Sequence, residues 1–234
     1  MTDAHCHVSC GDSSVREFLV GRDFIGVHPW DVSGRGSQLS IPELRAALAA
    51  NPRVGVGEIG LDRLREKTIS PVMRDAFEAQ LALAIELRRP VVLHGAKCWG
   101  QVVEAVKRHL GNVERPQQSF LFHGFSRSDG LIPDIVALNG YISVGPAILN
   151  DHAVNYRMLA KKIPADRLLV ETDRTEANAA ECPSVRDVLA KLAAIRGEDS
   201  AALAAQTDAN ATCFIESCFV RNEDNSNTEQ GKAK

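Results

Sequence analysis

Short apolar runs alternate with longer amphipathic runs along most of the chain, and this alternation restricts the possible folds more than any other feature. It predicts strands joined by helices, and therefore a parallel sheet. The strands are expected at 2–8, 23–29, 53–60, 90–95, 119–124, 140–145 and 167–172. The helices are expected at 12–21, 40–50, 71–88, 98–110, 129–138, 151–162, 184–196 and 199–219. Seven strands, each followed by a helix, favour a closed α/β barrel over an open sheet.

Length and composition are consistent with one domain. The 234 residues contain no linker and no break in composition, so we expect a single domain over 1–220 and a disordered polar tail over 221–234. The start has no basic-then-apolar leader, and no apolar run approaches about 18 residues, so neither a signal peptide nor a membrane span is expected. Six cysteines follow no framework pattern, and we interpret them as reduced thiols of a cytoplasmic protein.

Side chains that can bind metals or transfer protons gather where the predicted strands end. They are His5, His7, His28, Glu58, Asp62, His94, His123, Glu171 and Asp173. In a parallel barrel the carboxyl ends of the strands converge on one mouth, where such folds keep their sites. Five of the seven histidines fall at these ends, and the other two, His109 and His152, are interpreted as surface residues. The net charge of −3 gives no global basic field, so binding of nucleic acid would need a local patch or a metal.

The first predicted strand carries two histidines two residues apart, in the run Thr2-Asp3-Ala4-His5-Cys6-His7-Val8. On a β-strand this spacing places both imidazoles on one face, where they suit a borderline transition metal such as zinc. Asp3 falls on the same face and is predicted to orient an imidazole from behind. Cys6 faces the other way and is excluded as a ligand. The alternative is simply two polar residues on a strand.

Four of the strand-end histidines and two of the acids are enough to ligate two metal ions. Glu58 follows Val56-Gly57, and its two oxygens can bridge a metal pair that clamps the reacting oxygens of a phosphoryl transfer. Asp173 closes the apolar run 168–170 and can ligate a metal and accept the proton of a nucleophilic water. The alternatives are a solvated strand-end acid at Glu58 and a helix N-cap at Asp173.

Six short motifs follow one another along the chain. They are His5-Cys6-His7, Gly26-Val27-His28-Pro29, Gly57-Glu58-Ile59-Gly60-Leu61-Asp62, Pro90-Val91-Val92-Leu93-His94, Phe122-His123-Gly124-Phe125-Ser126 and Glu171-Thr172-Asp173. In this order they resemble the TatD family of metal-dependent hydrolases and deoxyribonucleases, which belong to the amidohydrolase-like barrels. The run Asn210-Ala211-Thr212-Cys213-Phe214 also resembles the closing segment of that family. The resemblance covers roughly residues 2–215, and six motifs in order are a specific signal.

The resemblance implies a distorted TIM-type (β/α) barrel with seven or eight parallel strands, outer helices and a dinuclear site. It implies two divalent metal ions (Mg, Mn or Zn), although ligands rich in imidazole favour a transition metal over magnesium. One metal would be held by His5, His7 and Asp173, and the other by His94 and His123. Glu58 would bridge the two metals, Asp173 would activate a water, and His28 would contact a substrate phosphate.

The implied activity is hydrolysis of DNA phosphodiester bonds, as a 3′-to-5′ exodeoxyribonuclease. The expected partner is therefore DNA, at single-stranded ends, with no membrane, no organic cofactor and no prediction of an oligomer. One rival is a barrel hydrolase of small amides, lactones or phosphoesters. Those relatives often use a carboxylated lysine as the bridge, whereas this chain offers Glu58. The other rival, a non-catalytic scaffold that holds metal, predicts a missing ligand or water-activating acid, and none is missing.

The sequence departs from the family pattern at three places, all near predicted strand ends. Ala96 stands where an arginine is usual, Arg127 where a glycine is usual, and Arg174 follows the final aspartate without the usual proline. These changes leave the six ligands intact and concern substrate recognition. Lys97, Arg127 and Arg174, with Arg63, could form a basic rim that binds a phosphate backbone. Ordinary solvated loop charge is the alternative.

Four further residues near the predicted mouth have both a functional and a structural interpretation. Trp30 and Trp99 are candidates for stacking a base, although loop packing is the more usual role of such residues. Glu171, as an acid inside a barrel, needs a partner, and is predicted to support the ligands by hydrogen-bonding a water, a histidine or Lys97. Asp62 is predicted to be structural and to hold the loop that follows its strand.

Overall fold

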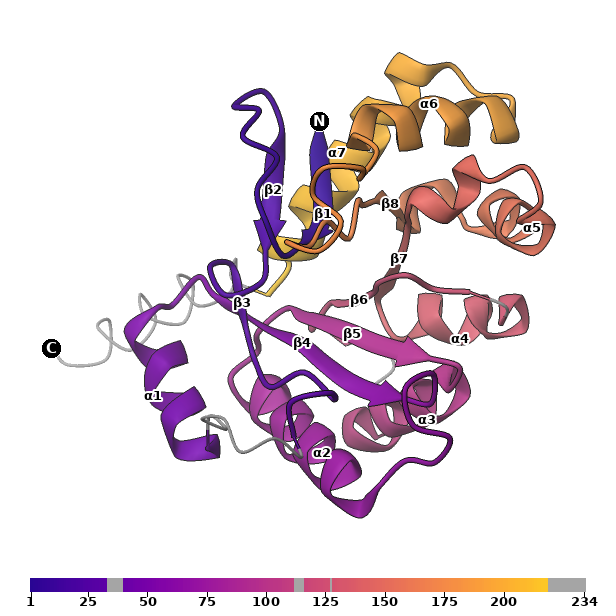
Figure 1. The fold of residues 1–234 in the computed structure, drawn as a ribbon. Coiled ribbons are helices and arrows are strands. Elements are labelled where there is room, and N and C mark those ends of the chain that lie inside the picture. The colour runs from indigo at the N-terminus through magenta and orange to yellow at the C-terminus, as the bar shows by residue number, and fades with distance from the viewer. Residues whose placement is uncertain (33–39, 112–115, 127, 219–234) are drawn as a thin grey trace, which may run out of the picture.

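The computed structural model describes residues 1–32, 40–111, 116–126 and 128–218, and within these ranges it contains eight strands and seven α-helices (Figure 1). The strands are β1 (Thr2–Cys6), β2 (Arg16–Leu19), β3 (Phe24–Ile25), β4 (Gly55–Asp62), β5 (Val91–Ala96), β6 (Phe120–Phe122), β7 (Gly140–Val144) and β8 (Leu168–Val170). The α-helices are α1 (Ile41–Ala50), α2 (Pro71–Glu86), α3 (Trp99–Leu110), α4 (Ile132–Ala137), α5 (Val154–Lys162), α6 (Val185–Arg196) and α7 (Ser200–Glu216). The tail predicted over 221–234 lies outside the described residues, and the predicted domain boundary stays a prediction.

All pairings between the described strands are parallel, and the strands follow one another in chain order. Strands β3 to β8 form one six-stranded sheet, and β1 pairs with β2. A single bridge between Val20 and Phe24 joins β2 to β3. At the other edge, Asp173 N–H donates to the carbonyl of His5, and His7 N–H donates to the carbonyl of Arg174. The predicted α/β class with parallel strands and outer helices is confirmed, although the described ladders do not close into one continuous barrel (Figure 1).

The prediction of a helix at 12–21 is wrong, because residues 16–19 of this segment form β2. Arg16 and Glu17 lie opposite Thr2 and Asp3 in a parallel pairing with β1. Phe18 is buried and packs against aromatic rings inside the barrel. Pairing with β1 and burial of the Phe18 side chain therefore favour a strand here, and this tertiary context overrides the local helical pattern.

Two other helix starts agree with their sequence signals. Ser40 caps α1 in a capping box with Glu43, as the run Ser40-Ile41-Pro42-Glu43 predicts. Ser70 caps α2, with Pro71 in the first turn. No described helix is both long enough and apolar enough to cross a membrane.

The interior of the barrel has an apolar layer beneath a polar one. Val92, Leu121 and Leu169 lie in the apolar layer, which Phe214 of α7 fills from below. The Phe214 ring stacks on Phe24 at 5.9 Å between centroids. Side chains two residues further along a strand point to the same face, one layer higher. The polar residues two positions on are His94, His123 and Glu171. Strand periodicity therefore places this polar layer at the carboxyl ends of the strands.

Candidate metal centre

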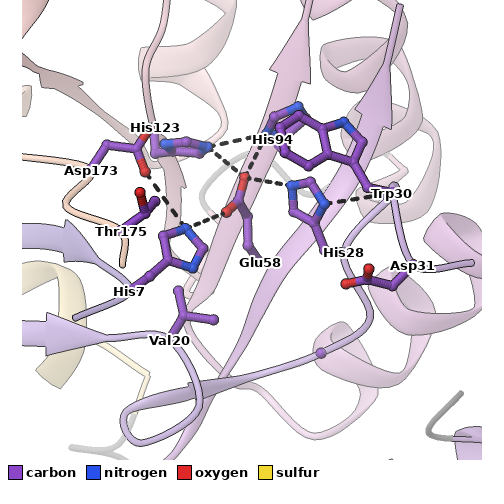
Figure 2. A pocket seen from close by; sticks show the side chains of 11 residues that line it. His7, Val20, His28, Trp30, Asp31, Glu58, His94, His123, Asp173 and Thr175 are labelled. Carbon is purple, nitrogen blue, oxygen red and sulfur yellow. Dashed lines mark hydrogen bonds and ion pairs between the residues drawn. The ribbon is translucent and has the colours of Figure 1, made fainter. Parts of the chain in front are cut away.

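One cleft opens at the carboxyl ends of the strands, with a volume of about 400 Å³ (Figure 2). It is lined by His7, Val20, Gly26, His28, Trp30, Asp31, Glu58, His94, His123, Asp173 and Thr175. Five of the six predicted metal ligands are in this wall, and the sixth, His5, is fully buried beside Glu58. The structure therefore brings together residues that lie up to 168 positions apart in the chain, from His5 to Asp173.

Glu58 of β4 lies at the centre of the site, and its two carboxylate oxygens face different imidazoles (Figure 2). Oε2 lies 3.3 Å from Nε2 of His5 and 3.4 Å from Nε2 of His7. Oε1 lies 2.5 Å from Nδ1 of His94 and 2.6 Å from Nε2 of His123. The oxygens therefore divide the four imidazoles into the two groups that a bridging carboxylate would serve.

The group on the Oε2 side has the spacing of a cation site. Asp173 Oδ1 lies 3.6 Å from Nε2 of both His5 and His7. Ligand atoms about 2.1 Å from a tetrahedral zinc ion lie about 3.4 Å from one another. The His5 ring is fully buried, and neither of its nitrogens has a hydrogen-bond partner among the described residues, which is unusual for a buried polar group. These residues therefore fit a divalent metal.

The group on the Oε1 side is held together by hydrogen bonds. His94 and His123 contact Glu58 at hydrogen-bond distances, and their facing nitrogens are 3.3 Å apart. Burial opposes a charge on His123, but Glu58 raises the pKa of this imidazole to about 10. Burial likewise opposes the charged Glu58, yet His123 and the neighbouring imidazoles hold its pKa well below the usual value. A buried carboxylate is thus balanced by a proton, which a metal displaces when it binds such ligands.

Asp62, at the end of β4, determines which nitrogen of His94 faces the site. Its Oδ2 accepts a hydrogen bond from His94 Nε2–H at 2.8 Å, which leaves Nδ1, the nitrogen that faces Glu58, as the one that can ligate a metal. Oδ1 accepts the backbone N–H groups of Leu64 at 2.7 Å and Arg65 at 2.8 Å. The predicted role of Asp62 in holding its loop is confirmed. Its contact with His94 is additional, and sequence reasoning missed it.

His28 presents a hydrogen-bond donor to the cleft. Its Nε2 lies 3.4 Å from Oε1 of Glu58, in a cluster with His94 that by position alone could hold a metal. Its Nδ1 accepts the backbone N–H of Trp30 at 3.2 Å. A neutral imidazole that accepts at one nitrogen carries its proton on the other. His28 therefore offers an N–H rather than a lone pair, which suits a phosphate oxygen better than a metal ion.

The prediction that Asp3 orients an imidazole is wrong. Its Oδ1 accepts the backbone N–H of Thr172 at 2.9 Å, and its Oδ2 accepts the Thr172 hydroxyl at 2.6 Å. It reaches His5 through the backbone N–H at 3.4 Å rather than through the ring. The segment after β8 lies closer to Asp3 than either imidazole does, so the carboxylate joins the first and last strands.

Glu171 lies behind His123, as one of its predicted roles requires. Its Oε1 is 3.9 Å from His123 Nδ1 and accepts the backbone N–H of Gly124 at 2.7 Å. Its Oε2 accepts a hydrogen bond from the Ser143 hydroxyl. Burial raises the pKa of Glu171 to about 7. This acid therefore holds the turn that carries His123 and faces its outer nitrogen.

The predicted basic rim is not found in the described wall of the cleft, which contains neither lysine nor arginine. Lys97 is exposed on a turn beyond β5, and Arg63 donates to the carbonyl of Lys67. Arg174 is half-buried, and its carbonyl oxygen joins the segment after β8 to β1. Arg127 lies outside the described residues. Contact of Lys97, Arg127 or Arg174 with the more distant parts of a long substrate stays a prediction.

The two tryptophans have different environments. Trp99 is buried, and its ring packs against Phe122 at 5.8 Å and Phe125 at 5.2 Å between centroids. The prediction that Trp99 stacks on a base is therefore wrong, and the residue packs in the core instead. Trp30 lines the cleft beside His28 (Figure 2).

The fold and the site define a metal-dependent hydrolase built on a parallel α/β barrel. A family model described as "TatD related DNase" matches residues 22–216. The chain belongs to the TatD family. His5 of β1 and His7, which follows that strand, precede the matched segment and join the site through the fold.

Similar proteins include two that are named 3′-5′ ssDNA/RNA exonuclease TatD. The protein from Klebsiella pneumoniae is 32% identical over 198 residues, which cover 79% of this chain and 73% of that protein. The protein from Escherichia coli K12 is 31% identical, with 79% and 74% covered. The crystal structure of YjjV, a TatD homologue from Escherichia coli K12, has a TM-score of 0.67 at 26% identity and covers 87% of this chain and 78% of that one.

Proposed function

We propose that this protein hydrolyses phosphodiester bonds of DNA as a metal-dependent 3′-to-5′ exonuclease acting at single-stranded ends. The observation that carries the proposal is the position of Glu58, whose two carboxylate oxygens face two separate groups of imidazoles. The named activity of its TatD relatives on ssDNA and RNA supports the choice of substrate.

We propose two divalent metal ions as the cofactors, from Mg, Mn or Zn. His5, His7 and Asp173 would hold one, and His94 and His123 the other, with Glu58 between them. Such a pair lowers the pKa of a water and stabilises the attacking and leaving oxygens of a phosphoryl transfer. The imidazole ligands favour a transition metal.

Three side chains of the chain itself then have distinct roles. Asp173 is half-exposed at the cleft, where its carboxylate can accept the proton of an attacking water. The Nε2–H of His28 can donate to a phosphate oxygen. Asp62 keeps the Nδ1 lone pair of His94 directed into the site.

The experiment uses purified protein and single-stranded DNA labelled at either the 3′ or the 5′ end, with Mg, Mn and Zn added separately. We expect stepwise loss of the 3′ label with at least one metal, and loss of that activity in Asp173→Asn. Asp151→Asn is the matched control, because Asp151 is an exposed acid away from the cleft. No hydrolysis of DNA with any metal, together with hydrolysis of a small ester or amide, would instead favour the small-molecule hydrolase.

We also propose that the protein acts in the cytoplasm. All six cysteines are free thiols in the structure, which supports a reducing compartment. Fractionation of the native cells, followed by detection with an antibody, tests this placement.

A further inference from the structure

Trp30 is exposed in the wall of the cleft. Exposure of a large aromatic side chain at a candidate site suggests that it contacts a ligand. Trp30 leaves 46% of its surface accessible, although most large apolar side chains of this protein are buried. Apart from the histidines, it is the only aromatic residue in the described lining (Figure 2). Its ring lies beside His28, the side chain that offers an N–H to the same cleft.

The indole ring is held in place on several sides. The indole lies close enough to the buried carboxylate of Asp62 to help hold the pKa of that acid below its usual value. The guanidinium carbon of Arg65 lies 5.3 Å from the ring centroid, at cation–π distance. The His28 ring meets it edge-on, with centroids 4.8 Å apart. An exposed ring that is already oriented loses little conformational entropy when a ligand stacks on it.

The position of the ring is tied to the metal centre. Asp62, which lies near the indole, also accepts a hydrogen bond from the outer nitrogen of His94, a predicted metal ligand. The Trp30 and His94 ring centroids are 6.1 Å apart. The aromatic surface therefore lies beside His94, at the edge of the predicted metal centre.

We propose that Trp30 is a stacking site for the unpaired nucleobase next to the scissile phosphate. The proposal rests on the proposed function and deepens it, because it says how a single strand is held. The π-face of an indole accepts any base, and Arg65 adds positive charge beside it, so the site tolerates sequence but requires a base. A role limited to covering Asp62 is the alternative, and it predicts no dependence on the base.

Binding of an uncleaved ligand to the metal-loaded protein tests this directly. The probe is a phosphorothioate-linked oligothymidylate, compared with the same strand carrying an abasic residue at its 3′ end. Affinity is measured for the natural chain, Trp30→Leu and Trp30→Phe. The chain has two tryptophans, and Trp99 is buried, so quenching of intrinsic fluorescence on binding reports on Trp30.

We expect the natural chain to bind the complete strand more tightly, with quenching that the abasic strand does not produce. Trp30→Leu should lose about 5- to 150-fold in affinity for the complete strand and little for the abasic one. Trp30→Phe should retain part of the affinity, because it keeps an aromatic ring but offers a smaller stacking surface. If the Trp30 variants do not fold, the natural chain still tests the proposal, through its affinities for the complete and the abasic strand.

The proposal is overturned if the natural chain binds both strands equally with equal quenching, or if Trp30→Leu binds the complete strand as the natural chain does. Hydrolysis is not needed for any of these measurements. Base-dependent quenching without nuclease activity would contradict the proposed function and leave the stacking site standing. Nuclease activity without any dependence of binding on the base would support the proposed function and contradict the stacking site.

Discussion

Replacing Asp62 with asparagine is expected to move the ring proton of His94 from Nε2 to Nδ1. The carboxylate accepts the backbone N–H groups of Leu64 and Arg65 with one oxygen and His94 Nε2–H with the other. Asparagine can keep the first pair of contacts only by turning its NH₂ group toward His94. Two donors would then face each other, so the proton of the imidazole moves to Nδ1, the atom that faces Glu58.

The magnitude follows from the role of the contact. A protonated Nδ1 cannot ligate a metal, and loss of such a supporting hydrogen bond costs about 10- to 100-fold in metal affinity. This corresponds to about 1.4 to 2.7 kcal/mol at the site that His94 and His123 would form. The site of His5, His7 and Asp173 should keep its affinity, because Asp62 contacts none of them.

The assay is a competition titration of zinc or manganese against a chromophoric chelator, combined with ¹⁵N NMR of the His94 ring. Asp199→Asn is the matched control. Asp199 also accepts two backbone N–H groups, from Ala201 and Ala202, but has no imidazole partner in the described structure. Melting temperatures show whether either variant is globally destabilised.

The reasoning is refuted if folded Asp62→Asn binds both metals as tightly as the control and the NMR spectra show Nε2 of His94 still protonated. A loss of affinity equal to that of Asp199→Asn would also refute it, because general loosening would then explain the effect.

Three further predictions concern other contacts in the site and the contact between β1 and the segment after β8. His28→Ala should weaken binding of single-stranded oligonucleotides while the metal content, measured by mass spectrometry, stays unchanged; loss of a metal would make His28 a ligand instead. Thr172→Val should lower the free energy of unfolding in urea by about 1–3 kcal/mol, because it leaves a buried oxygen of Asp3 without its donor, and Thr175→Val is the control. Chelation should lower the melting temperature, because a metal present at about 100 times its Kd stabilises the folded state by about 2.7 kcal/mol; an unchanged temperature would contradict a metal site around Glu58.

Much of the site could be predicted because strand periodicity carries it. The histidines and acids end short apolar runs, and parallel strands bring those ends to one mouth. His94 and His123 follow the buried Val92 and Leu121 by two residues, so they share the inward face of the barrel. Glu58 follows Val56 and Gly57 at the end of another such run, and the order of the motifs indicates the same residue.

Two of the errors arose where contacts between distant segments outweigh the local pattern. The local pattern predicts that residues 16–19 belong to a helix, but they pair with β1 as a strand. Asp3 shares a strand face with His5, yet the segment after β8 supplies Thr172, which takes both of its oxygens. Both errors concern the edge where the first strand meets its neighbours, which no local pattern describes.

By itself the sequence determined the class of fold, the family and the identity of the six candidate ligands, because each depends on spacing within short runs and on their order. Only the tertiary structure decided which ring nitrogen faces which carboxylate oxygen. The choice of Nδ1 in His94 and of Nε2–H in His28 depends on Asp62 and on the Trp30 backbone. An imidazole has two nearly equivalent nitrogens, so its chemistry is set by whichever partner the fold brings to the other side of the ring.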